Sequence, residues 1–312
     1  MENSQESWVG MREVSSYLGV TPETVRSYIQ DKGLPASKVG ARWKFRLSKV
    51  EEWAETGFVS EERESPSFVA VDSEVKLIQG DCISSMREIE SNSIDLILTD
   101  PPYNLGLFMQ DRDTNLKRMR ENYFGAAGWD NLEYEEWALS MDAFFEESAR
   151  VLKKGGAMIV FMAVIKVESI IQIAQRHGLY YKTTGTWHKL NPMPRNMNLH
   201  FINSTECWIY FVSGARTGTF NNNGKALHDF VETSVTPKSE RAFGKHPTQK
   251  PVELMKHFVE TLTNAGETVL DPFMGSGSTG VAAQSLGRDF IGIELDKAYC
   301  EIAAKRMNGG VK

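Results

Sequence analysis

The pattern of apolar and polar positions divides the chain at an irregular polar stretch, residues 55–74. Before this stretch, apolar residues recur at helical spacing over two short segments. After it, short apolar runs such as 94–98 alternate with longer amphipathic segments. Such runs are typical of strands buried on both faces of a parallel sheet, and their alternation with helices predicts a doubly wound α/β fold. We therefore expect a small domain over 1–57, a linker over 58–74 and an α/β domain over 75–312.

The α/β part contains the signals of individual elements. Strands are expected at 75–79, 94–99, 157–164, 182–187, 207–212, 268–270 and 290–295. Helices are expected at 134–153, 167–177, 251–264, 278–286 and 297–307. Ligands of such sheets gather beyond the carboxyl ends of the strands, so the residues that follow these strands are the candidates for a site.

The N-terminal part has the signals of two short helices followed by a β-wing. Thr21 is placed to cap a second helix that opens with Pro22. The stretch "KVGARWKFR", residues 38–46, then alternates basic with aromatic residues after a turn, which indicates a small wing with one basic face. Ser48 and Glu51 have the spacing of a capping box for a third helix.

The segment from Met11 to Glu55 resembles the MerR or excisionase type of winged helix-turn-helix. The resemblance implies that the module binds duplex DNA with the helix from Pro22 to Gln30 in the major groove. The candidate DNA-binding residues of this module, with one from a later loop, are Thr24, Arg26, Ser27, Arg42, Lys44, Arg46 and Arg195. A packing or dimerisation module remains the alternative, because short motifs also match by chance.

Charge and cysteine content narrow the class of protein. The formal net charge of -6 and the pI near 5.7 argue against a protein that coats nucleic acid by bulk charge, although a local basic patch is compatible with them. Cys82, Cys207 and Cys300 are widely spaced without a CxxC pair, so we expect neither a disulfide framework nor a zinc site. We expect no basic-then-apolar leader, and no apolar run reaches the roughly 20 residues that a membrane span needs. We expect a soluble protein of the bacterial cytosol or nucleoid.

The stretch "ETVLDPFMGSGSTG", residues 267–280, is the first candidate for a ligand site. A short apolar strand ends at Asp271, and Gly275 and Gly277 precede a helix. The N-terminus of a helix after such a loop attracts a carboxylate or a phosphate. Glu294 ends the next strand, 23 residues after Asp271, and an acid at roughly 20 residues is typical of binding to the ribose of an adenosine cofactor. The sequence lacks the lysine of a phosphate-binding GxxxxGK[ST] loop. This favours an adenosine cofactor without a pyrophosphate over a nucleotide bound by such a loop. The other alternative is that the stretch forms only a tight turn.

The stretch "LILTDPPYN", residues 96–104, is the second candidate. Pro101 and Pro102 remove two backbone donors and leave carbonyl acceptors. Asp100 adds carboxylate oxygens, and Tyr103 adds a flat ring. Acceptors beside an aromatic face suit an amino group on a planar base, and enzymes that act on a base of duplex DNA flip it out and hold it in this way. The stretch predicts a base-holding site.

Together, "DPPY" and "DPFMGSGST" resemble the amino-methylating DNA methyltransferases, which use S-adenosyl-L-methionine to modify adenine N6 or cytosine N4. The catalytic motif precedes the cofactor loop, which resembles the β class of these enzymes, a circular permutation of the shared Rossmann-like fold. The resemblance extends over 75–307 and includes "GDC" at 80–82 and "HPTQKP" at 246–251. It implies a site-specific DNA methyltransferase, with adenine N6 preferred because of the aspartate at position 100. The alternatives are a cytosine-N4 enzyme, an RNA methyltransferase and a non-enzymatic DNA-binding regulator.

The resemblance also assigns roles to single residues. Asp100 and the carbonyl of Pro101 would hold the target amine, with Pro102 in the same turn and Tyr103 stacked on the flipped base. The residues that would hold the cofactor are Asp81, Cys82, Thr248, Lys250, Asp271, Phe273, Gly275, Gly277, Ser278 and Glu294. Direct transfer of the methyl group requires no metal. The alternative roles are a helix cap for Asp81 and a solvated loop position for Lys250.

Two long polar segments, 105–131 and 213–245, are expected to close over DNA, because long loops in a compact domain are usually functional. The second lies where the family has its target-recognition region. Double-stranded DNA is therefore the implied partner, and the family also suggests a homodimer and a cognate restriction endonuclease.

Overall fold

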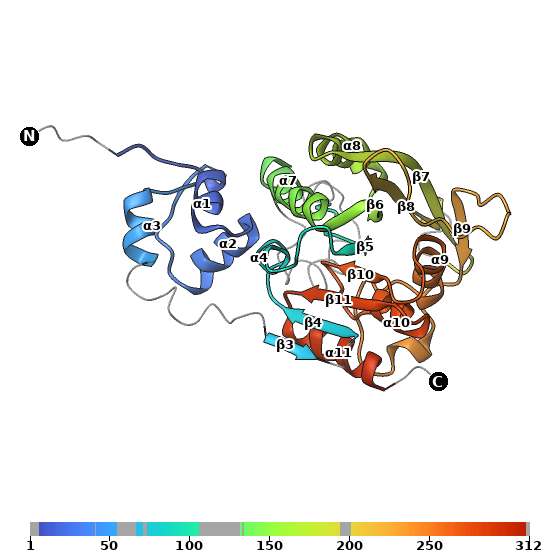
Figure 1. The fold of residues 1–312 in the computed structure, drawn as a ribbon. Coiled ribbons are helices and arrows are strands. Elements are labelled where there is room, and N and C mark those ends of the chain that lie inside the picture. Colours follow the sequence, from blue (N-terminus) through green and yellow to red (C-terminus); the bar gives the residue numbers. More distant parts are fainter. Residues whose placement is uncertain are drawn as a thin grey trace, which may run out of the picture. The chain divides into compact units, whose positions relative to one another are not determined.

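The computed structural model describes residues 6–40, 42–54, 67–70, 74–105, 132, 134–193 and 201–309. The chain forms two compact units, shown as ribbons in Figure 1. The first combines Met1–Ser67 with Asn104–Ala143, and the second combines Phe68–Tyr103 with Phe144–Lys312. The domain boundaries expected near residues 57 and 75 stay predictions.

The N-terminal module has the elements expected of a winged helix-turn-helix: α1 (Met11–Leu18), α2 (Pro22–Asp31), β1 (Ser37–Val39), β2 (Arg42–Lys44) and α3 (Leu47–Trp53). Thr21 caps α2 as predicted, because its side chain accepts a hydrogen bond from the amide of Thr24 at 3.1 Å. β1 and β2 pair antiparallel, with Lys38 opposite Trp43, so the predicted wing is confirmed. The side chains that are fully buried at the centre of this module are Val14, Val25, Phe45 and Val50.

The start of α3 differs from the prediction. The helix begins at Leu47, and its N-cap residue Arg46 provides no side-chain hydrogen bond. The amide and the hydroxyl of Ser48 donate instead to the carboxylate of Glu6, at 2.7 and 2.5 Å. The capping box expected at Ser48 and Glu51 is therefore wrong, because the carboxylate of Glu6, which precedes α1, takes the donors at this helix end.

The second unit is built on a mixed sheet with helices on both faces. Its strands are β3 (Ser67–Ala70), β4 (Val75–Gln79), β5 (Ile94–Thr99), β6 (Leu152–Met162), β7 (Leu179–Lys189), β8 (Thr205–Ser213), β9 (Phe230–Thr233), β10 (Thr268–Asp271) and β11 (Asp289–Glu294). Their order in the sheet is β3-β4-β11-β10-β5-β6-β8-β7-β9. The strands from β4 to β6 in this order run parallel, whereas β8 is antiparallel to both β6 and β7. β9 pairs with β7 in the parallel sense.

The helices and 3-10 turns of the described chain beyond the N-terminal module are α4 (Cys82–Arg87), α7 (Tyr134–Val151), η3 (Val164–Lys166), α8 (Val167–Arg176), η4 (Lys238–Arg241), α9 (Val252–Leu262), α10 (Ser278–Ser285) and α11 (Lys297–Asn308). Figure 1 shows α9, α10 and α11 along one face of the sheet, and α4 and α8 on the other. This two-sided cover confirms the expected doubly wound α/β fold. None of the helices in the described part is long and apolar enough to cross a membrane.

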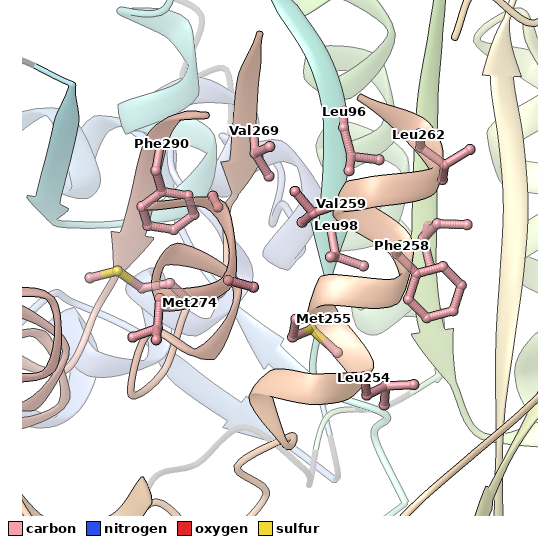
Figure 2. Packing of buried hydrophobic residues seen from close by; sticks show 14 of the residues in the cluster. Leu96, Leu98, Leu254, Met255, Phe258, Val259, Leu262, Val269, Met274 and Phe290 are labelled. Carbon is pink, nitrogen blue, oxygen red and sulfur yellow. The ribbon is translucent and has the colours of Figure 1, made fainter. Parts of the chain in front are cut away.

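The core between the sheet and α9 fixes the strand that leads to the predicted base-holding site. Figure 2 shows Phe258, Val259 and Leu262 of α9 beside Leu96 and Leu98 of β5. All five side chains are at most 4% exposed. Burial of an apolar side chain of this size contributes roughly 1.5–3 kcal/mol, so the end of β5 is anchored firmly before the polar residues that follow it.

Candidate active site

The predicted site residues converge at one edge of the sheet. β4, β11, β10 and β5 are parallel neighbours in this order, so their carboxyl ends meet at the same edge. Asp81 follows β4, Glu294 ends β11, Asp271 ends β10 and Asp100 follows β5. "DPPY" at 100–103 and the loop after Asp271 therefore lie at adjacent strand ends, although Asp100 and Asp271 are 171 residues apart in the chain.

The two carboxylate oxygens of Asp100, in the turn after β5, have different surroundings. Oδ2 of Asp100 accepts a hydrogen bond from the ammonium of Lys250, whose side chain is only 8% exposed. Oδ1 of Asp100 is buried and accepts no hydrogen bond from the residues that the structure describes. A buried acceptor without a donor is costly in a folded protein, so this oxygen marks a place where a ligand donor fits.

Two further charged residues complete the surroundings of this turn, and sequence reasoning missed both. Glu206 Oε2 lies 3.2 Å from Lys250 Nζ, and it accepts a hydrogen bond of 3.3 Å from the hydroxyl of Tyr103. Glu206 Oε1 forms an ion pair of 2.6 Å with Lys189. Lys189, Glu206, Lys250 and Asp100 thus form a row of alternating charges with no net charge, which we call the charge row.

Electrostatics favour the charged forms of Lys250 and Glu206, whereas the pKa of Asp100 is raised. Burial raises the pKa of Asp100, and Lys250 opposes that shift. Burial would lower the pKa of Lys250, but attraction to the two carboxylates outweighs it and holds that pKa above its ordinary value. Burial likewise disfavours the charge of Glu206, yet Lys250 and Lys189 keep its pKa below the usual range. The ammonium of Lys250 is therefore retained inside the site.

Tyr103 lies beside this row with its ring near a cation. Lys250 Nζ is 5.8 Å from the centre of the Tyr103 ring and 5.2 Å from that of Phe161. Burial and the two nearby carboxylates raise the pKa of Tyr103 well above its ordinary value, so the side chain stays a neutral phenol. A neutral aromatic ring at half-buried depth next to hydrogen-bond acceptors is suited to stacking on a base.

The loop after β10 is held to the turn after β5 by the carboxylate of Asp271. Oδ1 accepts hydrogen bonds from the hydroxyl of Thr99 at 2.8 Å and from the amide of Phe273 at 3.2 Å. Oδ2 accepts from the hydroxyl of Thr279 at 2.7 Å. Burial nevertheless raises the pKa of Asp271 to about 6. The contact of Asp271 with a cofactor stays a prediction, and its observed partners give it a supporting role between the two loops.

Glu294 has acceptor capacity left for a ligand. Its two oxygens accept one backbone amide each, from Gly275 at 2.9 Å and from Asp296 at 2.8 Å. Since an ionised carboxylate has about four lone-pair positions, it can also accept from two hydroxyl groups. The side chain is 5% exposed, and burial raises its pKa to about 7.

The glycine loop before α10 combines left-handed backbone with close packing. Gly275 and Gly277 have φ angles of 51° and 79°. A Cβ atom on Gly277 would lie 2.8 Å from the side chain of Met307, and one on Gly275 would lie 3.0 Å from the ring of His246. The loop therefore needs glycine for backbone geometry and for packing against the protein itself. α10 begins at Ser278 without a side-chain cap, which leaves an N-terminus suited to an anionic group.

The "HPTQKP" segment connects the loop before α10 with the charge row. The carbonyl of Lys250 accepts a hydrogen bond of 2.7 Å from the hydroxyl of Ser278, while the side chain of Lys250 extends to Asp100. The Lys250 side chain is buried, so the alternative of a solvated loop lysine is wrong.

Thr248 is exposed, with its hydroxyl 3.4 Å from His246 Nδ1. Burial and the Lys250 charge lower the pKa of His246 to about 4, so the ring is neutral near pH 7.

Arg306 of α11 is a further structural member of the site that sequence reasoning missed. Its side chain is 1% exposed, and one guanidinium nitrogen donates to the carbonyl of Ser276 at 2.6 Å and to the hydroxyl of Ser278 at 3.2 Å. The other faces Glu240 at 3.5 Å. Glu240 also accepts from the amide of Val252, so one buried ion pair joins the glycine loop to the start of α9.

Asp81 has the helix-capping role that was the alternative to cofactor binding. Its side chain accepts a hydrogen bond of 3.0 Å from the amide of Ser84 at the start of α4. Cys82 is buried as the first residue of that helix. The amide of Gly80 donates to the carbonyl of Glu294 at 2.9 Å, so these residues lie beside the end of β11. Their contacts with the adenine of a cofactor stay predictions.

The predicted DNA-binding residues differ in exposure. Ser27 and Arg42 are exposed, whereas Thr24, Arg26, Lys44 and Arg46 are half-buried. Arg26 forms an ion pair with Glu136 within the same unit, and the Arg46 guanidinium lies 5.0 Å from the centre of the Trp8 ring. Arg195 and most of the polar segment 105–131 lie outside the described residues.

The expected target-recognition region, 213–245, is described in full and is tied to the second unit at several points. β9 pairs with β7 at the sheet edge, and the amide of Asn221 donates to the carbonyl of Thr261 at 2.7 Å. Glu240, within the same region, supports the site through Arg306. Its role in reading a DNA sequence stays a prediction.

Comparisons with known proteins agree with this geometry. Residues 94–305 match the model of a family described as DNA methylase, for N6 and N4 methylation, and residues 8–57 match a helix-turn-helix domain. The Type II methyltransferase M2.LlaDCHI of Lactococcus lactis subsp. cremoris is 32% identical over 75% of this chain and 89% of its own length. M2.DpnII of Streptococcus pneumoniae is 31% identical over 74% of this chain and 88% of its own length.

Solved structures show the same fold. A complex of M1.HpyAVI with S-adenosylmethionine superposes with a TM-score of 0.57 at 29% identity, covering 75% of this chain and 99% of the other. The cytosine-N4-specific PvuII methyltransferase reaches a TM-score of 0.60 at 18% identity, over 74% of this chain and 86% of the other, which supports the fold alone. The doubly wound sheet and these comparisons together define the class, an amino-methylating DNA methyltransferase. This chain belongs to the DNA methylase family, and its cofactor is S-adenosyl-L-methionine.

Proposed function

We propose that the chain methylates the exocyclic amine of a flipped adenine, at N6, within a specific sequence of double-stranded DNA. The observation that carries the proposal is the buried Oδ1 of Asp100, an acceptor without a donor among the described residues, beside the ring of Tyr103. An amino group is the donor that suits this place. The preference for adenine over cytosine rests on the aspartate at position 100.

The residues at the sheet edge fit the cofactor. The uncapped N-terminus of α10 offers backbone amides for a carboxylate, and Thr248 lies on the neighbouring segment. Glu294 has lone pairs left for the ribose hydroxyls, and Asp81 and Cys82 lie beside it for the adenine ring. Bound there, S-adenosyl-L-methionine supplies an electrophilic methyl group on a sulfonium sulfur.

Residues of the chain itself would prepare the amine. The exocyclic nitrogen is a weak nucleophile, because its lone pair is delocalised into the base. Hydrogen bonds from that amine to Asp100 Oδ1 and to the carbonyl of Pro101 favour a pyramidal nitrogen with an available lone pair. Tyr103 would fix the plane of the base by stacking. The carboxylate also stabilises the positive charge that develops on the nitrogen during transfer.

The test measures methyl transfer and cofactor binding separately. Purified protein is incubated with bacterial genomic DNA and labelled S-adenosylmethionine, and single-molecule sequencing then assigns the modified base and its sequence. We expect N6-methyladenine at one short motif. For Asp100→Ala we expect the rate to fall on the order of 10²–10³-fold, as for other groups aimed at developing charge, with cofactor affinity nearly unchanged.

Glu90→Ala, which removes an exposed carboxylate before β5, is the matched control and should keep full activity. Normal activity of Asp100→Ala would refute the role of the turn. N4-methylcytosine at the motif would leave the mechanism standing and correct the base. Absence of incorporation by the wild-type protein into DNA, with transfer to RNA instead, would refute the proposed substrate.

The N-terminal module is proposed to add affinity for DNA through its helix α2 and its basic wing, with Ser27 and Arg42 as its exposed candidates. A homodimer, a cognate restriction endonuclease and a place in the bacterial cytosol are further proposals, which rest on the resemblance to the family.

A further inference from the structure

The ammonium of Lys250 lies at the proposed base-holding turn and has an N–H donor that its carboxylate partners do not use. An ammonium carries three N–H donors. In the described part of the chain, its hydrogen-bonding partners are two carboxylates, Asp100 and Glu206. The aromatic rings of Tyr103 and Phe161 lie within 5.8 Å of its nitrogen. These two carboxylates leave a third N–H of the ammonium unused, and the ammonium is bound to the carboxylate whose Oδ1 has no donor among the described residues.

The neighbouring carboxylate and ammonium match a specific chemical pattern. Adenine carries its amine next to a ring nitrogen that accepts hydrogen bonds, and so does cytosine. A flipped base is read by hydrogen bonds to this edge. If Asp100 Oδ1 accepts from the amine, the adjacent ring nitrogen needs a donor, and the Lys250 ammonium is bound to the other oxygen of the same carboxylate.

We propose that Lys250 donates a hydrogen bond to the ring nitrogen beside the target amine, so that Asp100 and Lys250 together recognise the edge that adenine and cytosine share. This inference rests on the proposed function and names the group that selects the base. Guanine and thymine present a carbonyl oxygen and a protonated ring nitrogen on this edge. They would place an acceptor against Asp100 and a donor against Lys250, and two mismatched buried polar contacts disfavour their binding.

Glu206 and Lys189 act as positioning residues in this arrangement. Glu206 holds the ammonium at 3.2 Å and the Tyr103 hydroxyl at 3.3 Å, so it fixes the donor and the stacking ring with one carboxylate. Lys189 in turn holds the second oxygen of Glu206 at 2.6 Å. These two residues lie on adjacent antiparallel strands, β7 and β8, which gives the ammonium a rigid support.

The test compares base analogues in a synthetic duplex that contains the target motif found by sequencing. In 1-deazaadenine a C–H replaces the ring nitrogen beside the amine, whereas 7-deazaadenine keeps that nitrogen and serves as the control. With the wild-type protein, we expect kcat/KM for 1-deazaadenine to be about tenfold to a hundredfold below that for 7-deazaadenine, the range for a lost hydrogen bond to a charged donor. Equal values for the two analogues would overturn the proposal without any variant.

Because 1-deazaadenine also changes pairing and amine basicity, the variant Lys250→Met provides a second readout. The variant should be slow with every base, and its ratio between the two analogues should shrink to less than about threefold. Lys297→Met, which removes an exposed lysine at the start of α11, should keep the wild-type ratio. Glu206→Gln should also shrink the ratio, since the ammonium loses one of its two anchors. An undiminished ratio in a folded Lys250→Met protein would overturn the proposal.

The outcome for the proposed function is read separately, from the unmodified duplex. If the wild-type protein fails to methylate adenine there, the proposed function fails. If it methylates adenine and ignores the loss of the ring nitrogen, only the role of Lys250 fails. Should sequencing assign cytosine, 3-deazacytosine takes the place of 1-deazaadenine, with the same expected ratio against unmodified cytosine.

Discussion

Cofactor affinity should depend on pH through Glu294. Burial raises the pKa of this carboxyl group to about 7 from its ordinary 4.5. The ionised form has lone pairs for the ribose hydroxyls, whereas the protonated form has lost acceptor capacity. Lowering the pH through 7 should therefore weaken the binding of S-adenosylmethionine, and raising it should strengthen the binding.

The magnitude follows from the fraction of Glu294 that is ionised. For a pKa of about 7, roughly one carboxyl in eleven is ionised at pH 6 and ten in eleven at pH 8. If only the ionised form binds, the dissociation constant should rise about tenfold between pH 8 and pH 6, which corresponds to about 1.4 kcal/mol.

The stability of the protein without cofactor should change in the opposite direction. Because the pKa of Glu294 is raised in the folded state, its stabilising contribution is complete below about 4.5 and is lost as the pH rises through about 7. The difference of 2.5 between these values corresponds to about 3 kcal/mol of unfolding free energy. Cofactor binding and folding thus favour opposite protonation states of the same group.

The assay is equilibrium binding of labelled S-adenosylmethionine between pH 5.5 and 8.5 at constant ionic strength. The variant Glu294→Gln should bind weakly and lose the pH-dependent component. Glu301→Gln, which removes an exposed carboxylate of α11, should retain it. The α-amino group of the cofactor also titrates near this range, but it contributes equally to the binding curves of all variants. The difference between the wild-type and Glu294→Gln curves therefore gives the contribution of Glu294 alone. Equal slopes for wild type and Glu294→Gln would refute the reasoning.

Two further predictions concern the loop before α10 and its support. Gly277→Ala should lower the free energy of unfolding by about 1–3 kcal/mol in urea denaturation, because its Cβ would lie 2.8 Å from Met307. Gly287→Ala, with a similar φ of 68° and no atom within 4 Å of its Cβ, should cost less, and equal losses would contradict the packing argument. Thr279→Val removes one donor to the buried Asp271 and should cost about 1–3 kcal/mol in thermal unfolding; an unchanged midpoint would show that this hydrogen bond contributes no net stability.

Local sequence signals were enough to predict the site residues that lie directly at the ends of strands. The apolar run at 94–98 predicts β5, so Asp100 had to lie at a sheet edge. The same reasoning placed Asp271 and Glu294, because each ends a short apolar strand. Their proximity then follows from the parallel order of the sheet.

Long-range partners could not be predicted in this way. Lys189 and Glu206 meet because β7 and β8 pair antiparallel, with Trp187 opposite Glu206, and no local pattern marks that register. β9 is a four-residue strand within a long polar region, so its alternating burial is too short a signal. The cap of α3 was missed for a similar reason, since Glu6 reaches Ser48 from 42 residues away.

Two buried links connect the turn after β5 with the loop before α10, and they bear on how the two reacting groups are aligned. Asp271 joins Thr99, directly before the proposed base-holding turn, to Thr279 in the first turn of α10. Lys250 forms a second link, through its carbonyl to Ser278 and its ammonium to Asp100. Alignment of two reacting groups can contribute roughly 7–11 kcal/mol to lowering a barrier, provided that neither group drifts. Both links are buried and join the same two segments, the one proposed to hold the methyl donor and the turn proposed to hold the amine. They therefore fix the position of these two segments relative to each other. A change at either link should lower the rate of methyl transfer more than the affinity for the cofactor.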